Sequence, residues 1–274
     1  MFGLAMLIGC AVGVALGLTG GGGGVFAVPL LVYGLAITPR EAVGISLASV
    51  GGTALVGLGP RLLHGDVEVR TGLLFAGAGM AGAPIGTFLS TKIPETFLLL
   101  MFSAVMLVVA WQMWSKTRRT QRAERTCKTN GKADEVSASC RRDEQGTLRM
   151  TSRCAWLLVA VGTLTGVLAG LFGVGGGFVI VPALVLVSGM EIHRAVGTSL
   201  FVIVLISVSG VLSHIAGGRA ISTGTTIQFL AGGIVGIWLG SLLATRLNGP
   251  TLQKVFATAV VLVAGFVVVN TIVL

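Results

Sequence analysis

Residues 17–31 read GLTGGGGGVFAVPLL, and residues 170–184 read GLFGVGGGFVIVPAL. Neither stretch contains a charged residue, and each places a run of glycines directly before an apolar segment that contains one proline. Glycine destabilises a helix by roughly 1 kcal/mol per residue relative to alanine, so each run predicts a helix break. The chain therefore interrupts two apolar helices in the same way.

The two stretches belong to a longer internal repeat. A shift of 153 positions aligns residues 17–47 with residues 170–200, and 15 of these 31 pairs are identical. The identities keep glycine, proline and serine in order, which chance similarity between apolar segments does not produce. A shift of 154 extends the match further along each half. We predict two homologous halves, residues 1–114 and 154–274, joined by a linker at 115–153.

The composition predicts that both halves lie in a membrane. The 274 residues are 54% hydrophobic and 11% charged, with a mean hydropathy of +0.94, whereas soluble domains carry about a quarter charged residues. Several apolar stretches approach the roughly 20 residues that cross a bilayer. We predict an all-α polytopic membrane protein with about five helical segments per half. The first segment lacks a basic leading region, so we expect it to be retained rather than cleaved as a signal peptide.

The positive charge is concentrated in the linker, residues 115–153. This stretch holds 11 of the 19 Lys and Arg residues and 5 of the 10 Asp and Glu residues. No aromatic residue interrupts it, so it offers no stacking platform for bases, and we expect no nucleic-acid partner. Cytoplasmic loops of membrane proteins carry an excess of Lys and Arg. We therefore predict a cell inner membrane protein with a cytoplasmic linker and with both termini on the opposite side.

Each glycine-broken pair of segments is nearly twice as long as one crossing. It forms either two short passes or a re-entrant hairpin, and both options give each half an odd number of crossings. The halves are then inverted relative to each other, which is a common construction of secondary transporters. We expect the broken helices to meet near the membrane midplane. The fourth segments carry small residues at i, i+4 spacing, whose expected role is close helix packing.

The glycine runs are the predicted binding site. Backbone groups freed by a helix break persist in hydrocarbon only when they are buried in protein or line a wet cavity. Helix N-termini attract anions, and glycine lets a ligand approach the backbone. No charged residue lies in the middle of a predicted span, which disfavours a cation site and leaves backbone and hydroxyl groups to hold an anion. The candidate substrate-binding residues are Thr19, Gly20, Gly21, Gly22, Gly23, Gly24, Ser46, Ser49, Gly173, Gly175, Gly176, Gly177, Thr198 and Ser199.

The histidines and cysteines give weaker indications of function than the glycine runs. His64 and His214 each follow the third segment of their half and are candidates for a proton-linked role, with an interfacial position and no ligand as the alternative. The four cysteines show no C-x-x-C spacing, so we expect no metal site and no cofactor. A cytoplasmic location predicts free thiols.

Two copies of G-x-x-G-x-G-G-G, each followed by a proline in an apolar helix and then by A-V-G-(I/T)-S-L, resemble the TauE/SafE family of bacterial membrane permeases. The resemblance covers both halves and leaves out the linker. It implies transport of a small sulfur-containing anion such as sulfite, a sulfonate or sulfoacetate. The residues themselves predict a small anion bound between the halves.

For such a permease we expect alternating access, with one half moving against the other about the two breaks. Two alternative functions remain compatible with the sequence. One is an anion channel of the same architecture, and the other is a membrane enzyme or assembly factor, although no nucleophile–base arrangement stands out. The bilayer is an expected partner, and a homodimer is compatible with the sequence.

Overall fold

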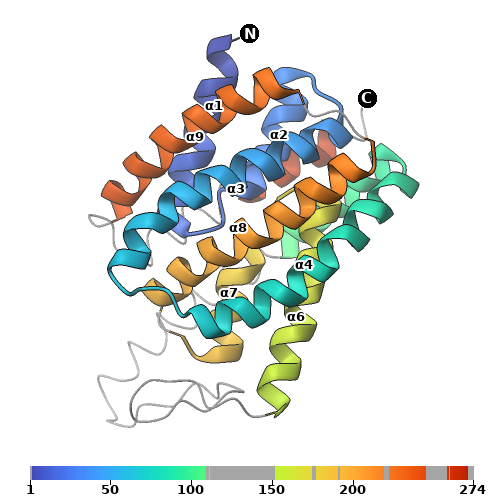
Figure 1. Cartoon of the computed structure of the whole chain (residues 1–274). Coiled ribbons are helices and arrows are strands. Elements are labelled where there is room, and N and C mark those ends of the chain that lie inside the picture. The colour runs from blue at the N-terminus through green and yellow to red at the C-terminus, as the bar shows by residue number, and fades with distance from the viewer. Residues whose placement is uncertain are drawn as a thin grey trace, which may run out of the picture.

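A computed structural model gives the helices of the chain and their packing (Figure 1). All regular structure in the described residues is helical. Five helices are long and apolar enough to cross a membrane, in agreement with the predicted all-α polytopic fold. The predicted linker lies outside the described residues except for its last two positions. The structure describes residues 2–108, 111, 152–174, 177–190, 192–218, 222–244, 258 and 260–270.

The helices follow the order that the sequence predicts for the two halves. Those of the first half are α1 (Phe2–Thr19), α2 (Gly24–Leu35), α3 (Pro39–Leu63), α4 (Val69–Lys92) and an apolar helix at Glu95–Val108. Those of the second half are α6 (Ser152–Phe172), α7 (Gly177–Ser188), α8 (Ile192–Ala216), α9 (Thr223–Ala244) and an apolar helix at Val260–Asn270.

The first glycine break turns α2 back along α1. Gly34, near the end of α2, packs on Ile8, near the start of α1, whereas Gly23, just before α2, packs on Leu16. At 1.5 Å per residue, the 12 residues of α2 extend about 18 Å, well short of the roughly 30 Å of hydrocarbon in a bilayer. The pair α1–α2 is therefore a helical hairpin whose second arm is too short for a crossing of its own.

The third helices of the two halves, α3 and α8, lie side by side and run in opposite directions (Figure 1). Gly44, near the start of α3, packs on His214, near the end of α8, and Gly51, further along α3, packs on Ser207. Two equivalent helices that pair antiparallel are related by a twofold rotation about an axis perpendicular to both.

Glycines allow helices of one half to pack closely against helices of the other. Gly13 of α1 lies against the backbone of Gly233 in α9, and the equivalent Gly166 of α6 lies against the backbone of Gly79 in α4. A Cβ at Gly13 or Gly166 would overlap the partner helix, so only glycine permits this approach. The packing role predicted for the small residues of the fourth helices is confirmed, because Gly82 of α4 lies against the backbone of Thr163 in α6 and Gly236 of α9 lies against that of Cys10 in α1.

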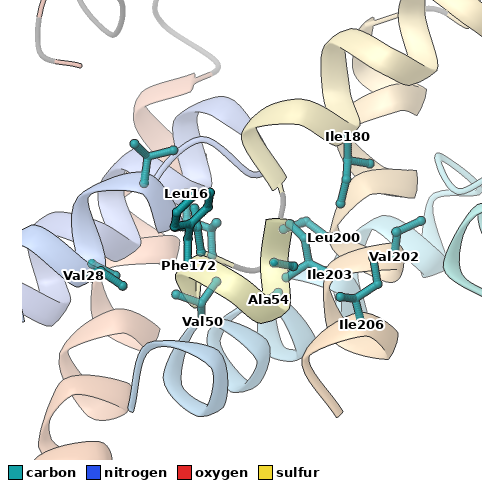
Figure 2. Close-up of a cluster of buried hydrophobic side chains, with 14 of the residues drawn as sticks. Leu16, Val28, Val50, Ala54, Phe172, Ile180, Leu200, Val202, Ile203 and Ile206 are labelled. Carbon is teal, nitrogen blue, oxygen red and sulfur yellow. The ribbon is translucent and has the colours of Figure 1, made fainter. Parts of the chain in front are cut away.

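The buried apolar core also draws on both halves (Figure 2). Leu16 and Val28 from the first hairpin belong to the same cluster as Phe172 and Ile180 from the second. The outer surface carries large apolar side chains, such as Trp238, which is 65% exposed. Such a surface suits contact with lipid, because lipid tails are as apolar as the side chains themselves.

The linker cysteines for which free thiols are expected, Cys127 and Cys140, lie outside the described residues. Cys10 is a free thiol, whereas Cys154 at the start of the second half is disulfide-bonded.

Candidate functional site at the two helix breaks

The two helix breaks begin with the same backbone geometry. Gly20 and Gly173 have φ angles of +72° and +70°, in the left-handed region that favours glycine. Each donates its N–H to the carbonyl four residues earlier, Gly20 to Leu16 at 2.7 Å and Gly173 to Ala169 at 2.8 Å. A left-handed glycine with this hydrogen bond is a common helix ending. The predicted interruption of both helices is confirmed at equivalent positions.

The two breaks lie against each other inside the protein. A Cβ on Gly21 would lie 2.6 Å from the carbonyl oxygen of Gly177, and Gly24 packs in the same close manner on the backbone of Val174. Gly24 and Gly177 are the first residues of α2 and α7. The N-termini of the two short helices therefore meet, and each carries the positive end of a helix dipole.

Each break is covered by the beginning of the third helix of the other half. Gly20 lies against the side chain of Val196 on α8, and Gly173 lies against the backbone of Val43 on α3. Val43 and Val196 occupy equivalent positions of the repeat. Sequence reasoning did not assign these valines to the site, although their place in the repeated A-V-G motif is a signal that could have identified them.

Two of the predicted hydroxyl residues hold the first break in place. Thr19 Oγ1 donates to the carbonyl of Ala15 at 2.7 Å and accepts from the N–H of Gly22 at 2.9 Å. Ser199 Oγ, fully buried on α8, donates to the carbonyl oxygen of Gly20. The structure thus brings Thr19 and Ser199 together with the glycines of the first break, all five of which are buried.

Ser46 is the counterpart of Ser199 in the repeat, but its surroundings differ. It is fully buried on α3, one helical turn after Val43, and its Oγ has no hydrogen-bond partner in the described part of the chain. Leaving a buried hydroxyl unpaired costs roughly 1–3 kcal/mol. Among the described residues, Thr71 and Ser207 are the other buried residues with unpaired side-chain oxygens.

Two further predicted hydroxyls bind neighbouring elements rather than a break. Ser49 Oγ donates to the carbonyl of Thr226 on α9 at 3.3 Å. Thr198 Oγ1 accepts from the N–H of Glu68, between α3 and α4, at 3.0 Å. These contacts position helices around the site. Predicted residues Gly175 and Gly176 lie outside the described residues.

The two candidate histidines lie in different environments. His64 is exposed at the end of α3, and its Nδ1 lies 2.6 Å from the carbonyl oxygen of Pro60. His214 is 1% exposed and packs on Gly44 between α3 and α8. Of the two, only His214 is buried between the halves. Among the described residues, no group of three or more His, Cys, Asp and Glu could hold a metal ion.

Comparison with known proteins identifies the family. The model of the family described as "Sulfite exporter TauE/SafE" matches residues 5–267. A "Probable membrane transporter protein" of Xylella fastidiosa is 35% identical over 263 residues, which is 95% of this chain and 92% of that protein. The "Probable membrane transporter protein YunE" of Bacillus subtilis is 26% identical over 254 residues, 90% of this chain and 88% of that protein. No solved structure matches the chain significantly.

The family match runs through both halves, including the two hairpins that carry the glycine breaks. The similar proteins are described as membrane transporters and not as enzymes. These comparisons agree with the apolar helices that are long enough to span a membrane. The chain belongs to the TauE/SafE family of membrane transporters.

Proposed function

We propose that the protein is a secondary transporter of a small sulfur-containing anion, such as sulfite, a sulfonate or sulfoacetate. The anion binds where the two helix breaks meet. The observation that carries the proposal is the contact between Gly21 and Gly177, which brings together the N-termini of α2 and α7. Two helix N-termini offer N–H donors and positive dipole ends to the same anion. The description of the family as sulfite exporters supports the substrate class.

The first break contains backbone N–H groups that are not hydrogen-bonded to other described residues. The N–H groups of Gly20 and Gly22 are already bonded within the hairpin. Those of Gly21, Gly23 and Gly24 have no partner among the described residues, and we assign them as donors to the anion. Glycine at these positions lets neighbouring backbone segments pack directly against the break, because a Cβ on any of the three would overlap backbone atoms.

The anion is bound without a charged side chain. Among the described residues, the buried polar side chains are those of serine, threonine and His214. A neutral site suits a transporter, because binding has to be favourable enough to load the solute and weak enough to release it. It also avoids the high cost of a charged side chain inside a bilayer.

Alternating access follows from an inverted arrangement of the two halves. The antiparallel pairing of α3 and α8 supports this inversion. Val43 and Val196 cover the two breaks in the conformation described here, and they lie toward opposite ends of the antiparallel pair. When the first turn of α3 or of α8 moves away from the break that it covers, the breaks become exposed to one side of the membrane. Movement of the other helix then exposes them to the opposite side.

A counterflow measurement in proteoliposomes tests the proposal. Vesicles loaded with unlabelled sulfite and diluted into labelled sulfite should transiently accumulate the label, because a carrier exchanges one anion for the other. Competition by thiosulfate, sulfoacetate, sulfate and acetate ranks the substrates. An anion channel would give conductance without transient accumulation. A complete lack of flux for all of these anions would remove the proposed substrate class.

A further inference from the structure

The two halves differ at one pair of equivalent hydroxyls, those of Ser46 and Ser199. Both side chains are fully buried, and each lies one helical turn after the valine that covers a break. Ser199 Oγ lies within hydrogen-bond distance of the carbonyl oxygens of Gly20 and Val196, which share its single proton. Ser46 Oγ has no hydrogen-bond partner among the residues that the structure describes. The same residue at the same repeat position therefore has two different environments.

The position of Ser46 places its hydroxyl beside the second break. Val43, one turn earlier on the same helix, lies against Gly173, just as Val196 lies against Gly20. Ser46 follows Val43 by one helical turn, which places it on the part of α3 that lies against the second break.

The packing of α3 gives no reason for a serine at position 46. An unpaired buried hydroxyl is less favourable than an apolar group of similar shape, because it has lost its hydrogen bonds to water and gained none. Ser46 thus retains a donor that the protein itself does not use.

We propose that Ser46 and Ser199 have separate functions in the transport cycle. Ser46 Oγ donates a hydrogen bond to the anion at the second break, and Ser199 Oγ holds the first break in its covered conformation. The assignment rests on the proposed function, because it names a specificity-determining residue of the same site. A hydrogen bond to a charged acceptor is roughly twice as strong as one between neutral groups, so an oxyanion gains from Ser46 more than a neutral solute does.

Three alanine variants of the full chain in detergent test the two roles. Ser46→Ala removes the proposed donor, and Ser199→Ala removes the hydrogen bond to Gly20. Ser207→Ala is the matched control, because Ser207 is also buried and unpaired but lies against Gly51, along the contact between α3 and α8. The melting temperature is measured for each variant without anion and in a series of sulfite concentrations, which yields the Kd.

The expected results separate the roles. Without anion, Ser46→Ala and Ser207→Ala keep or raise the Tm, because each removes an unpaired hydroxyl. Ser199→Ala lowers the Tm by about 2–4 °C, because the carbonyl of Gly20 loses its donor. The Kd for sulfite weakens about tenfold or more in Ser46→Ala alone. Ser199→Ala binds sulfite at least as tightly as the wild type, because the covered conformation is less favoured.

Each other outcome overturns a defined part of the inference. Wild-type affinity in Ser46→Ala removes the donor role, and so does an anion-free Tm of Ser46→Ala well below that of Ser207→Ala. An unchanged Tm in Ser199→Ala removes the holding role of Ser199. If the wild type binds neither sulfite nor a sulfonate, the proposed function fails and this inference fails with it. Equal binding by the wild type and Ser46→Ala overturns the inference alone.

Discussion

Gly21 and Gly177 lie so close that a Cβ on either would fall within 2.6 Å of the carbonyl oxygen of the other. The two residues belong to different halves. Gly21 lies between the end of α1 and the start of α2, and Gly177 is the first residue of α7. The two breaks therefore form one structural unit to which both halves contribute. This mutual contact is the basis of the first prediction.

Replacing Gly21 or Gly177 with alanine should abolish anion counterflow. The added methyl would meet backbone rather than a flexible side chain, so the breaks must separate, and overpacking of this kind costs about 1–3 kcal/mol of stability. Gly77→Ala on α4 is the control, because a Cβ there has open space around it. Flux in proteoliposomes, normalised to inserted protein, is the measurement. Normal flux in both break variants would contradict the predicted site.

The two left-handed glycines should respond differently to a second mutation. A Cβ on Gly20 would meet the side chain of Val196, whereas a Cβ on Gly173 would meet the Cα of Val43 at 2.5 Å. The double variant Gly20→Ala/Val196→Ala should therefore regain part of the stability lost in Gly20→Ala. Val43→Ala should give no such recovery to Gly173→Ala, because the obstacle is backbone.

Thermal unfolding of the four variants in detergent checks this difference. Recovery is expected to be incomplete at Gly20, since an alanine with positive φ keeps a backbone strain of about 1 kcal/mol. Equal recovery in both double mutants would show that the clash at Gly173 is relieved in another way.

The glycine contact between α1 and α9 should contribute strongly to stability. Gly236→Ala places a methyl group against the backbone of Cys10 and should lower the Tm markedly, by an amount equivalent to about 1–3 kcal/mol. Gly224→Ala in the same helix is the matched control, because nothing lies near its Cβ position. It should leave the Tm unchanged or raise it, as alanine favours helix over glycine. Similar losses in both variants would argue against a specific packing role.

Cysteine labelling should reveal the orientation of the chain in the membrane. His64 lies in the connection that leads from α3 into α4, and Lys92 ends α4, so the two residues mark opposite sides of the α4 crossing. In a background without native cysteines, His64→Cys should react with an impermeant maleimide only from the cytoplasmic side, and Lys92→Cys only from the other side. Labelling of both from one side would contradict the crossing of α4, and the reverse sidedness would contradict a cytoplasmic linker.

The sequence by itself determined the membrane class, the internal repeat and the position of the helix breaks. These features depend on local chemistry. Hydropathy decides whether a segment partitions into lipid, and the conformational freedom of Gly20 and Gly173 decides where a helix stops. Both causes operate within a few residues, so they can be read from the chain without knowledge of its partners.

Only the tertiary structure decided which segments meet and what each equivalent residue does. The pairing of α1 with α9, and the covering of the breaks by Val43 and Val196, depend on contacts across the two halves. Ser46 and Ser199 are the same residue in the same motif, yet one is unpaired and the other is bonded to Gly20. A hydrogen bond depends on the distance and direction of a partner far away in the sequence, and the folded arrangement alone sets those quantities.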